Sequence, residues 1–574
     1  MFNITEKMTN RISLIIVVLF AFIITFTLIY QNIIHQIGIG YPYIDIYLYL
    51  IEASRLFGIE TGGYKYINFL PPFIPFLTSL LFRIGFVSEF SIFITTGIFY
   101  IFGILGMYYI LKLRFNNYYS TFGAIFYGLF KINMKYVGNG LLDTAFIALM
   151  LWAIYFFILA MEKNQNYFYI AIPLAIISFF TKYPGGLIFP LMLLYFMGKT
   201  RFFYNIKKYS KGLVKGAISG VITLIPFLAY FVINKIPLGF INQAQEISSR
   251  ASLKFATSEI NLMGNDLFFY IKIIEKIISF PLWKIEFRKI ILLIAIIGLI
   301  ITIYFVGKNL INSFSEIKNS KIRLCKWNVS SKLMYLIFSI SLILILISFL
   351  TASLISFAIS ELLLFTGLYL CAYSFTKIFL KYDNAEEISS TRYPYLLINI
   401  VMIGFFFSFL VFFSAHLIKQ SRYSTSMAPG IVFLITLSIE TLMIKTKDIK
   451  IKKINLKQLI PIFIILVMLL SSINYINHLK YDKNAADEKL AVNYLKDKEG
   501  VIMSDRGPVY TFYLKKEVKL IRDMDQKNLD KELLDNHAEY VTTFHQVNLT
   551  HYSPIKEFGN ITIYKKNNEN EFVQ

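Results

Sequence analysis

The sequence predicts a mostly α-helical, polytopic membrane protein with about thirteen spans and a small C-terminal α/β domain. Of the 574 residues, 56% are hydrophobic and only 16% are charged, and the mean hydropathy is +0.59. A soluble globular chain carries more charge, so this composition indicates a chain that crosses a bilayer several times. Apolar runs recur from residue 11 to residue 476, whereas the stretch after residue 480 mixes charged and apolar residues.

Fourteen apolar runs follow one another along the chain. They occupy residues 11–31, 71–86, 91–111, 118–137, 141–161, 167–183, 186–199, 212–234, 289–308, 331–357, 361–380, 394–416, 427–445 and 459–476. No small-residue cleavage site follows the first run, so we expect a span there rather than a signal peptide. The run 71–86 is short and holds three prolines, which predicts a juxtamembrane or half-inserted helix instead of a crossing. We expect 118–137 to form one span, although Lys131 and Lys135 interrupt it.

The net charge of +22 indicates membrane orientation rather than a nucleic-acid partner. Most of the excess lies in three short loops between apolar runs, at 199–211, 318–326 and 445–457. Cytoplasmic loops retain Lys and Arg in this way, next to anionic headgroups. With these loops inside, a multi-pass cell-membrane protein is predicted whose N-terminus is cytoplasmic and whose C-terminal domain is external.

Three segments are then external: the first loop 32–90, the middle loop 235–288, and the domain 481–574 that follows the transmembrane domain 1–480. The middle loop contains FFYIKIIEKIISFPLW, which has an apolar face and three charged residues and predicts an interfacial helix. In the C-terminal domain, AADEKLAVNYLKDK and NLDKELLDN predict helices, and GVIMSD, AEYVTTFH and NITIYKK predict strands.

Several ionisable residues fall on the external face, in loops or near the predicted ends of spans. They are Asp45, Glu52, Arg55, Lys65, Asp143, Lys182 and Arg422. A charge in the middle of a span costs about 2.5–3.5 kcal/mol and less near its ends, so tolerance explains any one of them alone. Their convergence on one side of the membrane favours a functional site.

Five short motifs occur in a fixed order around these residues. They are Asp45 with Tyr49, Ala53 and Arg55; the pair Pro71 and Pro72; Asp143 at the start of a span; Thr181, Lys182, Pro184 and Gly186 in a turn; and Arg422 and Tyr423 with Pro429 a few residues on. In this order the motifs resemble the GT-C class of membrane glycosyltransferases, in the branch with protein O-mannosyltransferases and the lipid A aminoarabinose transferase. A soluble external C-terminal domain is also common in that branch.

The resemblance implies an enzyme that moves a sugar from a polyprenyl phosphate, dolichyl or undecaprenyl, to an acceptor on the external face. Such a transfer needs a carboxylate to take the acceptor proton, cations to hold the leaving phosphate, and an apolar groove for the prenyl tail. We expect Asp45 to be the general base of a single displacement that inverts the anomeric centre. Arg55, Lys182 and Arg422 are the candidates for the phosphate.

The remaining candidates for substrate binding are Tyr49, Glu52, Tyr423 and His416. Tyr43, Tyr47 and Tyr49 could stack on sugar faces, although an aromatic belt at the membrane interface is the commoner reason for tyrosines there. His416 closes a span next to Arg422 and could bond the phosphate, or it could simply lie at headgroup level.

One position departs from the resemblance. The branch usually has Glu directly after the catalytic Asp, and this chain has Ile46 instead. A carboxylate pair at 45–46 is therefore absent. If a second acid or a divalent metal, Mg²⁺ or Mn²⁺, is needed, Glu52 or Asp143 would have to supply the carboxylate. Asp143 is the candidate catalytic residue beside Asp45.

Two other functions stay open at this point. A transporter or flippase of lipid-linked sugars would show charges or Gly/Pro breaks near the middle of several spans, whereas the ionisable residues here gather at one face. The departure at Ile46 also fits an inactive glycosyltransferase-like partner subunit. The sequence leaves open which sugar moves and whether the acceptor is a protein, a lipid or a glycan.

Overall fold

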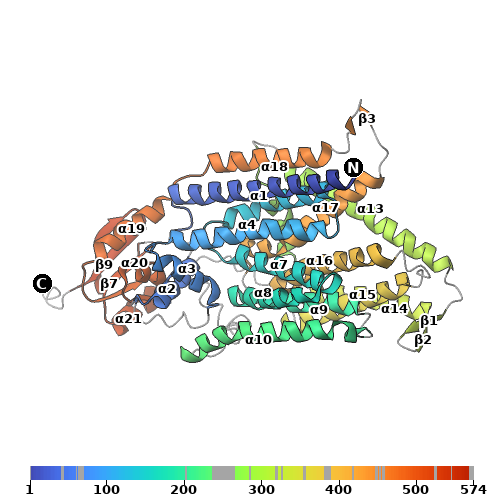
Figure 1. The fold of residues 1–574 in the computed structure, drawn as a ribbon. Coiled ribbons are helices and arrows are strands. Elements are labelled where there is room, and N and C mark those ends of the chain that lie inside the picture. The colour runs from blue at the N-terminus through green and yellow to red at the C-terminus, as the bar shows by residue number, and fades with distance from the viewer. Residues whose placement is uncertain are drawn as a thin grey trace.

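The computed structural model has a long bundle of helices with a small α/β domain at one end (Figure 1). It describes residues 2–39, 44–59, 61, 70–200, 203, 205–234, 266–282, 286–316, 321–324, 327–352, 357–380, 389–416, 419–445, 450–451, 454–455, 459–521, 526–544 and 546–567. Tyr43, Lys65 and residues 235–265 of the middle loop lie outside these ranges.

The helices of the bundle coincide with the apolar runs. They are α1 (Phe2–Ile34), α4 (Phe90–Lys112), α5 (Asn117–Gly128), α6 (Lys131–Tyr136), α7 (Asp143–Glu162), α8 (Phe168–Thr181), α9 (Ile188–Lys199), α10 (Ser210–Ile233), α13 (Phe287–Glu316), α14 (Ser331–Leu350), α15 (Phe357–Leu380), α16 (Ser389–Ala415), α17 (Ala428–Lys445) and α18 (Leu459–Asn477). Apart from α5 and the short α6 (KINMKY), they are rich in Leu, Ile, Phe and Val, which is what a segment surrounded by lipid or by other helices requires.

The polytopic helical fold is therefore confirmed. Among the described residues, eight helical stretches are long and apolar enough to cross a membrane, in α1, α4, α7, α10, α14, α16, α17 and α18. The other predicted spans coincide with α5–α6, α8, α9, α13 and α15. The total of about thirteen spans stays a prediction.

Two short helices lie at the end of the bundle that carries the α/β domain (Figure 1). They are α2 (Ile44–Phe57) and α3 (Phe73–Arg83), which pack against each other. α3 has 11 residues, so it is about 16 Å long, roughly half the thickness of a hydrocarbon core. This length agrees with the prediction that the run 71–86 does not cross.

The segment 118–137, which we expected to form one interrupted span, is two helices, because the chain leaves the helical conformation at Leu129 and Phe130 between α5 and α6. Side chains take over the carbonyl groups at the end of α5. The hydroxyl of Tyr100 donates to the carbonyl of Gly128 at 2.6 Å, and the amide of Asn133 donates to that of Tyr127 at 3.0 Å. These bonds satisfy carbonyls that would otherwise lack partners at a helix end. A new helix, α6, begins at Lys131.

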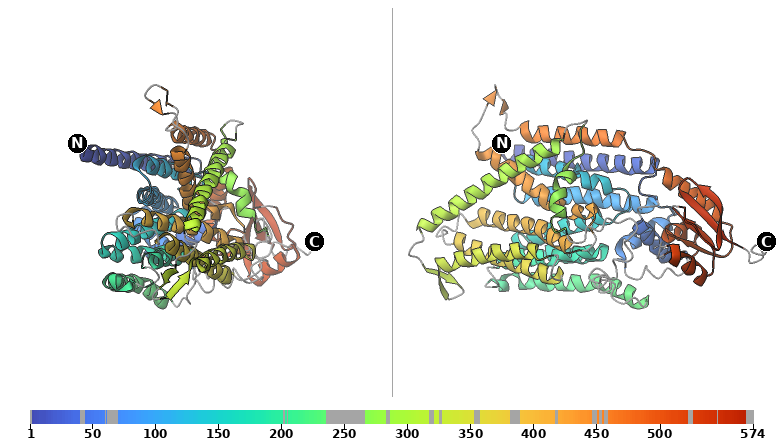
Figure 2. Two further views of the ribbon diagram at one scale, coloured as in Figure 1. Left: turned by 90° about the vertical axis from the view of Figure 1, so that its right-hand side faces the viewer. Right: turned by 180° about the vertical axis from the view of Figure 1, so that it is seen from behind.

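Two of the basic loops contain short hairpins at the end of the bundle opposite the α/β domain (Figures 1 and 2). One pairs β1 (Lys321–Leu324) with β2 (Trp327–Ser330), and the other pairs β3 (Lys450–Ile451) with β4 (Ile454–Asn455). These two basic loops and the C-terminal domain therefore lie at opposite ends, as the topology from charge requires. Which end is cytoplasmic stays a prediction.

The C-terminal domain is a five-stranded mixed sheet with three helices. Its elements are α19 (Lys483–Leu495), β5 (Val501–Ser504), α20 (Gly507–Leu514), β6 (Val518–Leu520), α21 (Gln526–Asp535), β7 (Ala538–Thr543), β8 (Tyr552–Phe558) and β9 (Ile561–Lys566). The strand order is β6-β5-β7-β9-β8, with β5 parallel to β6 and β7, and β9 antiparallel to β7 and β8. The sequence predicted α19, α21, β5, β7 and β9 and missed α20, β6 and β8.

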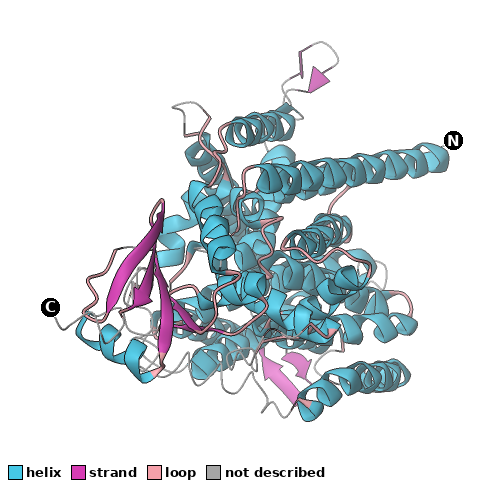
Figure 3. Cartoon of the chain, turned by 90° about the vertical axis from the view of Figure 1, so that its left-hand side faces the viewer, coloured by secondary structure: helices cyan, strands magenta, loops and turns pink. Residues whose placement is uncertain are grey.

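The domain packs on the bundle through one face of its sheet. Buried residues of α19 and α20, such as Val492 and Val509, belong to the same apolar cluster as the core of the helical bundle. On the other face, α21 covers Met503 and Val541 with Leu529 and Leu533. Viewed from this end of the molecule, the sheet lies to one side of the helices (Figure 3).

Candidate active site

Asp45 forms an ion pair with Arg422, which is far from it in the sequence. Asp45 lies in the first turn of α2, where the helix dipole favours a carboxylate. Arg422 comes from η6 (Ser421–Met427), a 3₁₀ segment that joins α16 to α17. Nη2 of Arg422 lies 2.7 Å from Oδ2 of Asp45, and 48% of the Asp45 side chain stays accessible. The carboxylate is therefore both held by a cation and open to a ligand.

A second ion pair joins Asp143, in the first turn of α7, to Lys182 at the end of α8. Nζ of Lys182 lies 2.6 Å from Oδ1 of Asp143, whose side chain is buried. The turn after Lys182 requires glycine, because a Cβ at Gly185 would come within 2.5 Å of the carbonyl oxygen of Ser178. This close approach lets the chain reverse directly after α8 and leaves Lys182 at the helix end, beside α7.

The aromatic ring of Tyr423 lies beside both cations. Nζ of Lys182 is 5.4 Å from the ring centroid and the guanidinium carbon of Arg422 is 5.3 Å from it. On the α16 side the ring stacks on Phe413, with centroids 4.7 Å apart and planes within 9°. Cation–π contacts of this kind attract both basic groups to the face of the ring. The two ion pairs and this ring form one cluster, which we call the charge cluster.

The electrostatics of Asp45 reflect both pairs. Burial raises the pKa of its carboxyl, but the nearby charges of Arg422 and Lys182 outweigh burial and hold the pKa below its ordinary value. Tyr49, one turn further along α2, faces the same cluster. Burial and the charges of Asp45 and Asp143 raise the pKa of its hydroxyl, so Tyr49 remains a neutral hydrogen-bond donor.

Two further side chains, those of His416 and Lys419, come from the segment between α16 and η6. The ring of His416 lies 5.7 Å from that of Tyr423. Lys419, which the sequence analysis missed, is buried and donates to the carbonyls of Phe413 and Ser414 at 3.1 and 2.5 Å, at the end of α16. Burial lowers the pKa of Lys419 to about 8. In the sequence, the position of Lys419 between His416 and Arg422, three residues from each, was the signal that could have identified it as a site residue.

Glu52 and Arg55 form a separate cluster with Tyr230 of α10. Nη2 of Arg55 lies 2.9 Å from Oε1 of Glu52 and 3.1 Å from the hydroxyl of Tyr230, which also donates to Glu52. Burial raises the pKa of Glu52 despite Arg55 and Tyr230. Glu52 is two helical turns from Asp45, so the structure brings Asp143, and not Glu52, into the charge cluster.

Two residues next to Asp45 point away from the cluster. Ile46 is fully buried, and the loop before α7 approaches it so closely that a Cβ on Gly140 would lie 3.0 Å from its Cγ2. Tyr47 is also fully buried and packs against Phe512 and Tyr513 of the C-terminal domain. Tyr47 therefore cannot stack on a sugar, and Ile46 fills the core where an acid was expected from the resemblance.

Within the described ranges, no group of three or more His, Cys, Asp and Glu side chains is placed to hold a metal ion. Asp45 and Asp143 each contact a side-chain cation already. The chain itself therefore supplies a positive charge beside each of the two carboxylates.

The family model described as dolichyl-phosphate-mannose-protein mannosyltransferase matches residues 70–233. This match includes Asp143 and Lys182 and leaves Asp45 and Arg422 outside. No curated protein sequence matches the chain. With the polytopic fold, the match supports the expected resemblance, which is to membrane glycosyltransferases of the GT-C class.

Solved structures with distant likeness include two enzymes. One is the archaeal oligosaccharyltransferase AglB from Archaeoglobus fulgidus in complex with an inhibitory peptide and a dolichol-phosphate, at 12% identity and a TM-score of 0.46, covering 94% of this chain and 69% of that one. The other is ArnT from Cupriavidus metallidurans bound to undecaprenyl phosphate, at 11% identity and a TM-score of 0.43, covering 96% and 97%.

Proposed function

We propose that this protein is an inverting glycosyltransferase that takes a sugar from a polyprenyl-phosphate donor and transfers it to an acceptor at the external membrane face. The observation that carries the proposal is the charge cluster, in which the Asp45–Arg422 and Asp143–Lys182 pairs meet beside Tyr423. One accessible carboxylate and two cations are the groups that such a transfer needs.

In the proposed reaction, Asp45 accepts the proton of an acceptor hydroxyl while its oxygen attacks the anomeric carbon. The bond from that carbon to the phosphate oxygen breaks, and the polyprenyl phosphate leaves with the electron pair. Attack from the face opposite the leaving group inverts the anomeric centre. Arg422 and Lys182 hold the phosphate and stabilise the charge that grows on it, Arg422 through two parallel hydrogen bonds.

The ion pair also explains how the base could be activated. While Arg422 contacts Asp45, it holds the pKa of the carboxyl low and makes it a weak base. A donor phosphate that takes up the guanidinium removes this contact, so the pKa of Asp45 rises towards the value of a useful base. Donor binding would then switch on proton acceptance.

The other members of the cluster have supporting roles in this proposal. Asp143 directs Lys182 at the phosphate, Tyr49 donates a hydrogen bond to the sugar, and the ring of Tyr423 with His416 forms one wall. Glu52 and Arg55 fix α2 to α10 through Tyr230. Because side-chain cations neutralise the phosphate, no metal step is included, and turnover is expected to persist in EDTA.

The test is turnover by the full chain in proteoliposomes, with a labelled polyprenyl-phosphate sugar and cell-envelope material as the acceptor pool. We expect label to move from the lipid to the acceptor, and Asp45→Asn to reduce this by about 10²–10⁴-fold. Label that crosses the bilayer while still on the lipid would indicate a transporter instead. Neither transfer nor transport would indicate an inactive partner subunit, and full activity of Asp45→Asn would contradict the proposed base.

A further inference from the structure

The C-terminal domain contacts the helix that carries Asp45 directly. The hydroxyl of Tyr513, in α20, lies 3.2 Å from the hydroxyl of Tyr47, in α2. The rings of Tyr47 and Tyr513 are 5.8 Å apart, and Phe512 packs edge-on against Tyr47 at 5.9 Å. Since Tyr47 is fully buried, this contact is a packed interface and not a chance approach of two exposed rings.

Tyr47 lies on the opposite side of α2 from Asp45. Residues two positions apart in an α-helix are separated by about 200° around its axis, and the two side chains have different partners accordingly. Asp45 reaches Arg422, while Tyr47 reaches α20. The C-terminal domain therefore packs on the Tyr47 side of α2, and the charge cluster lies on the opposite, Asp45 side.

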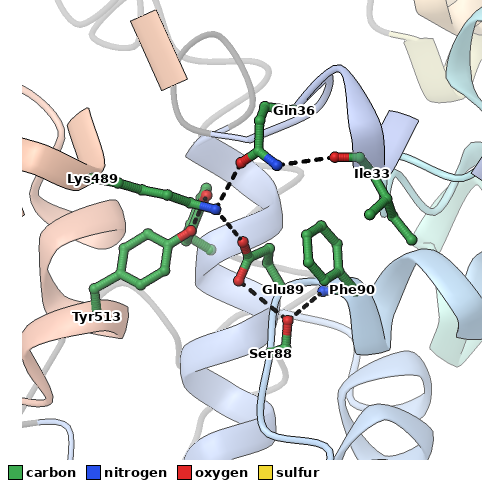
Figure 4. Close-up of polar contacts among 8 residues, drawn as sticks. Ile33, Gln36, Ser88, Glu89, Phe90, Lys489 and Tyr513 are labelled. Carbon is green, nitrogen blue, oxygen red and sulfur yellow. Dashed lines mark hydrogen bonds and ion pairs between the residues drawn. The ribbon is translucent and has the colours of Figure 1, made fainter. Parts of the chain in front are cut away.

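A second set of bonds fixes the same domain to both ends of the first loop. Nζ of Lys489, in α19, lies 2.9 Å from Oε1 of Glu89 and 2.8 Å from Oε1 of Gln36 (Figure 4). Gln36 follows α1, and Glu89 precedes α4. The backbone amide of Asp482 also donates to the carbonyl of His35 at 2.9 Å. The segment that holds α2 is thus tied to the domain at its start, its middle and its end.

We infer that the C-terminal domain positions the catalytic helix, with Tyr513 and Lys489 as its positioning residues. This inference rests on the proposed role of Asp45. Asp45 pairs with Arg422 only if α2 keeps its rotation and height relative to η6, because both groups reach across from separate elements. The packing of Ile46 in the apolar core fixes the start of α2, and the bonds from Glu52 and Arg55 to Tyr230 fix its C-terminal end. The C-terminal domain supports α2 on the side of Tyr47.

The test uses the full chain with Tyr513→Phe, Tyr47→Phe and the double variant. Each single variant removes the hydroxyl pair, so we expect kcat to fall by about two- to tenfold with the donor KM unchanged. The double variant should lose no more than Tyr513→Phe alone, because Tyr513→Phe already removes the bond to Tyr47 together with the one to Glu89. Tyr552→Phe is the matched control, since that buried hydroxyl bonds the carbonyl of Ala538 inside the sheet at 3.0 Å.

Two further readouts separate positioning from general damage. Amide hydrogen exchange in residues 44–57 should become faster in Tyr513→Phe and not in Tyr552→Phe, since α2 has lost a support. A loosened α2 also lets Asp45 draw away from Arg422 before the donor binds, so the acid limb of the pH–kcat/KM profile, which reports the free enzyme, should move to higher pH.

Unchanged exchange together with an unmoved acid limb would overturn the inference. Faster exchange in α2 with an unmoved limb would uphold the contact between the domain and α2 but overturn the role of Asp45 as the base. The failure of this inference and the failure of the proposed function are therefore distinguishable in one set of variants.

Discussion

Arg422 and Asp45 form an ion pair of 2.7 Å between two elements that neither bury it completely nor leave it in open solvent. A pair of this kind contributes little free energy and can be exchanged, because its charges remain accessible to a ligand that offers better partners. In the proposed reaction, the donor phosphate is this partner for Arg422, and the acceptor hydroxyl is this partner for Asp45. The same contact that stabilises the protein without ligand therefore marks where both substrates would arrive.

The phosphate assignment predicts selective loss of donor use. Replacing Arg422 or Lys182 by Ala removes one charge-assisted contact, which costs about 1.5–3 kcal/mol, roughly ten- to a hundredfold in kcat/KM for the donor. Acceptor kinetics should change less. Lys272→Ala is the control, because that lysine is 64% exposed and pairs with Asp266. Normal donor kinetics in both alanine variants would place the phosphate elsewhere.

The two acids are predicted to differ. Asp45→Asn keeps size and hydrogen bonding but cannot accept a proton, whereas Asp143→Asn weakens only the hold on Lys182. We expect Asp143→Asn to lose about ten- to a hundredfold in donor kcat/KM, a smaller loss than that of Asp45→Asn. Single-turnover rates over a range of donor concentrations, from subsaturating to saturating, measure the difference. Equal inactivation of both variants would mean that Asp143 shares the chemistry as a second acid.

The sequence predicted the helices well and the site only in part, for physical reasons that can be seen at particular residues. Apolar runs identify α1, α4 and α7 because lipid demands one composition along the whole length of a span. The same rule cannot find the break at Phe130, which depends on Tyr100 and Asn133 donating to carbonyls of α5.

At the site, motif order gave Asp45, Asp143, Lys182 and Arg422, and the structure brings these together. It could not show that Glu52 and Arg55 turn to Tyr230, since that depends on how α2 is rotated relative to α10. The sequence also could not predict that Tyr513 contacts α2, because the short stretch GPVYTFYL that forms α20 has no helical periodicity of apolar residues.

Restoring the acid expected after Asp45 should harm the protein. Ile46→Glu would place an unpaired carboxylate in a fully buried position against Ile92 and Gly140, which costs about 3–5 kcal/mol of stability. Ile46→Val removes one methylene group and should cost only about 0.5–1.5 kcal/mol. Thermal unfolding in detergent compares the two. An Ile46→Glu protein with unchanged stability and higher turnover would mean that the pocket accepts a carboxylate pair.

A buried acid in the C-terminal domain predicts a pH dependence with a definite sign. Burial, helped by the charges of Asp505 and Asp482, raises the pKa of Glu488 from 4.5 to about 7. Arg506, which lies 3.4 Å away, lowers this pKa but does not outweigh burial. In this window the folded domain binds more protons than the unfolded one, so its free energy of unfolding should fall as pH rises from about 4.5 to 7 and level off above.

Amide exchange of Ile502 and Met503 in the intact protein, corrected for the intrinsic pH dependence of exchange, measures this stability. Glu488→Gln cannot titrate and should flatten the slope. A slope that survives this substitution would have to come from another group.

The orientation of the chain is predicted from charge, and α4 offers the sharpest test. α4 has 23 residues, about 34 Å of helix, enough to cross the hydrocarbon core once. Ser88 precedes it at the end that carries the C-terminal domain, and Asn117 follows it at the other end. With Cys325 and Cys371 replaced, Ser88→Cys should react with an impermeant thiol reagent on intact cells, and Asn117→Cys should react only after the membrane is opened. The opposite pattern would turn the charge cluster to the cytoplasm. Donor and acceptor would then have to meet on that side, and the basic hairpins would face outwards against the rule that cytoplasmic loops retain Lys and Arg.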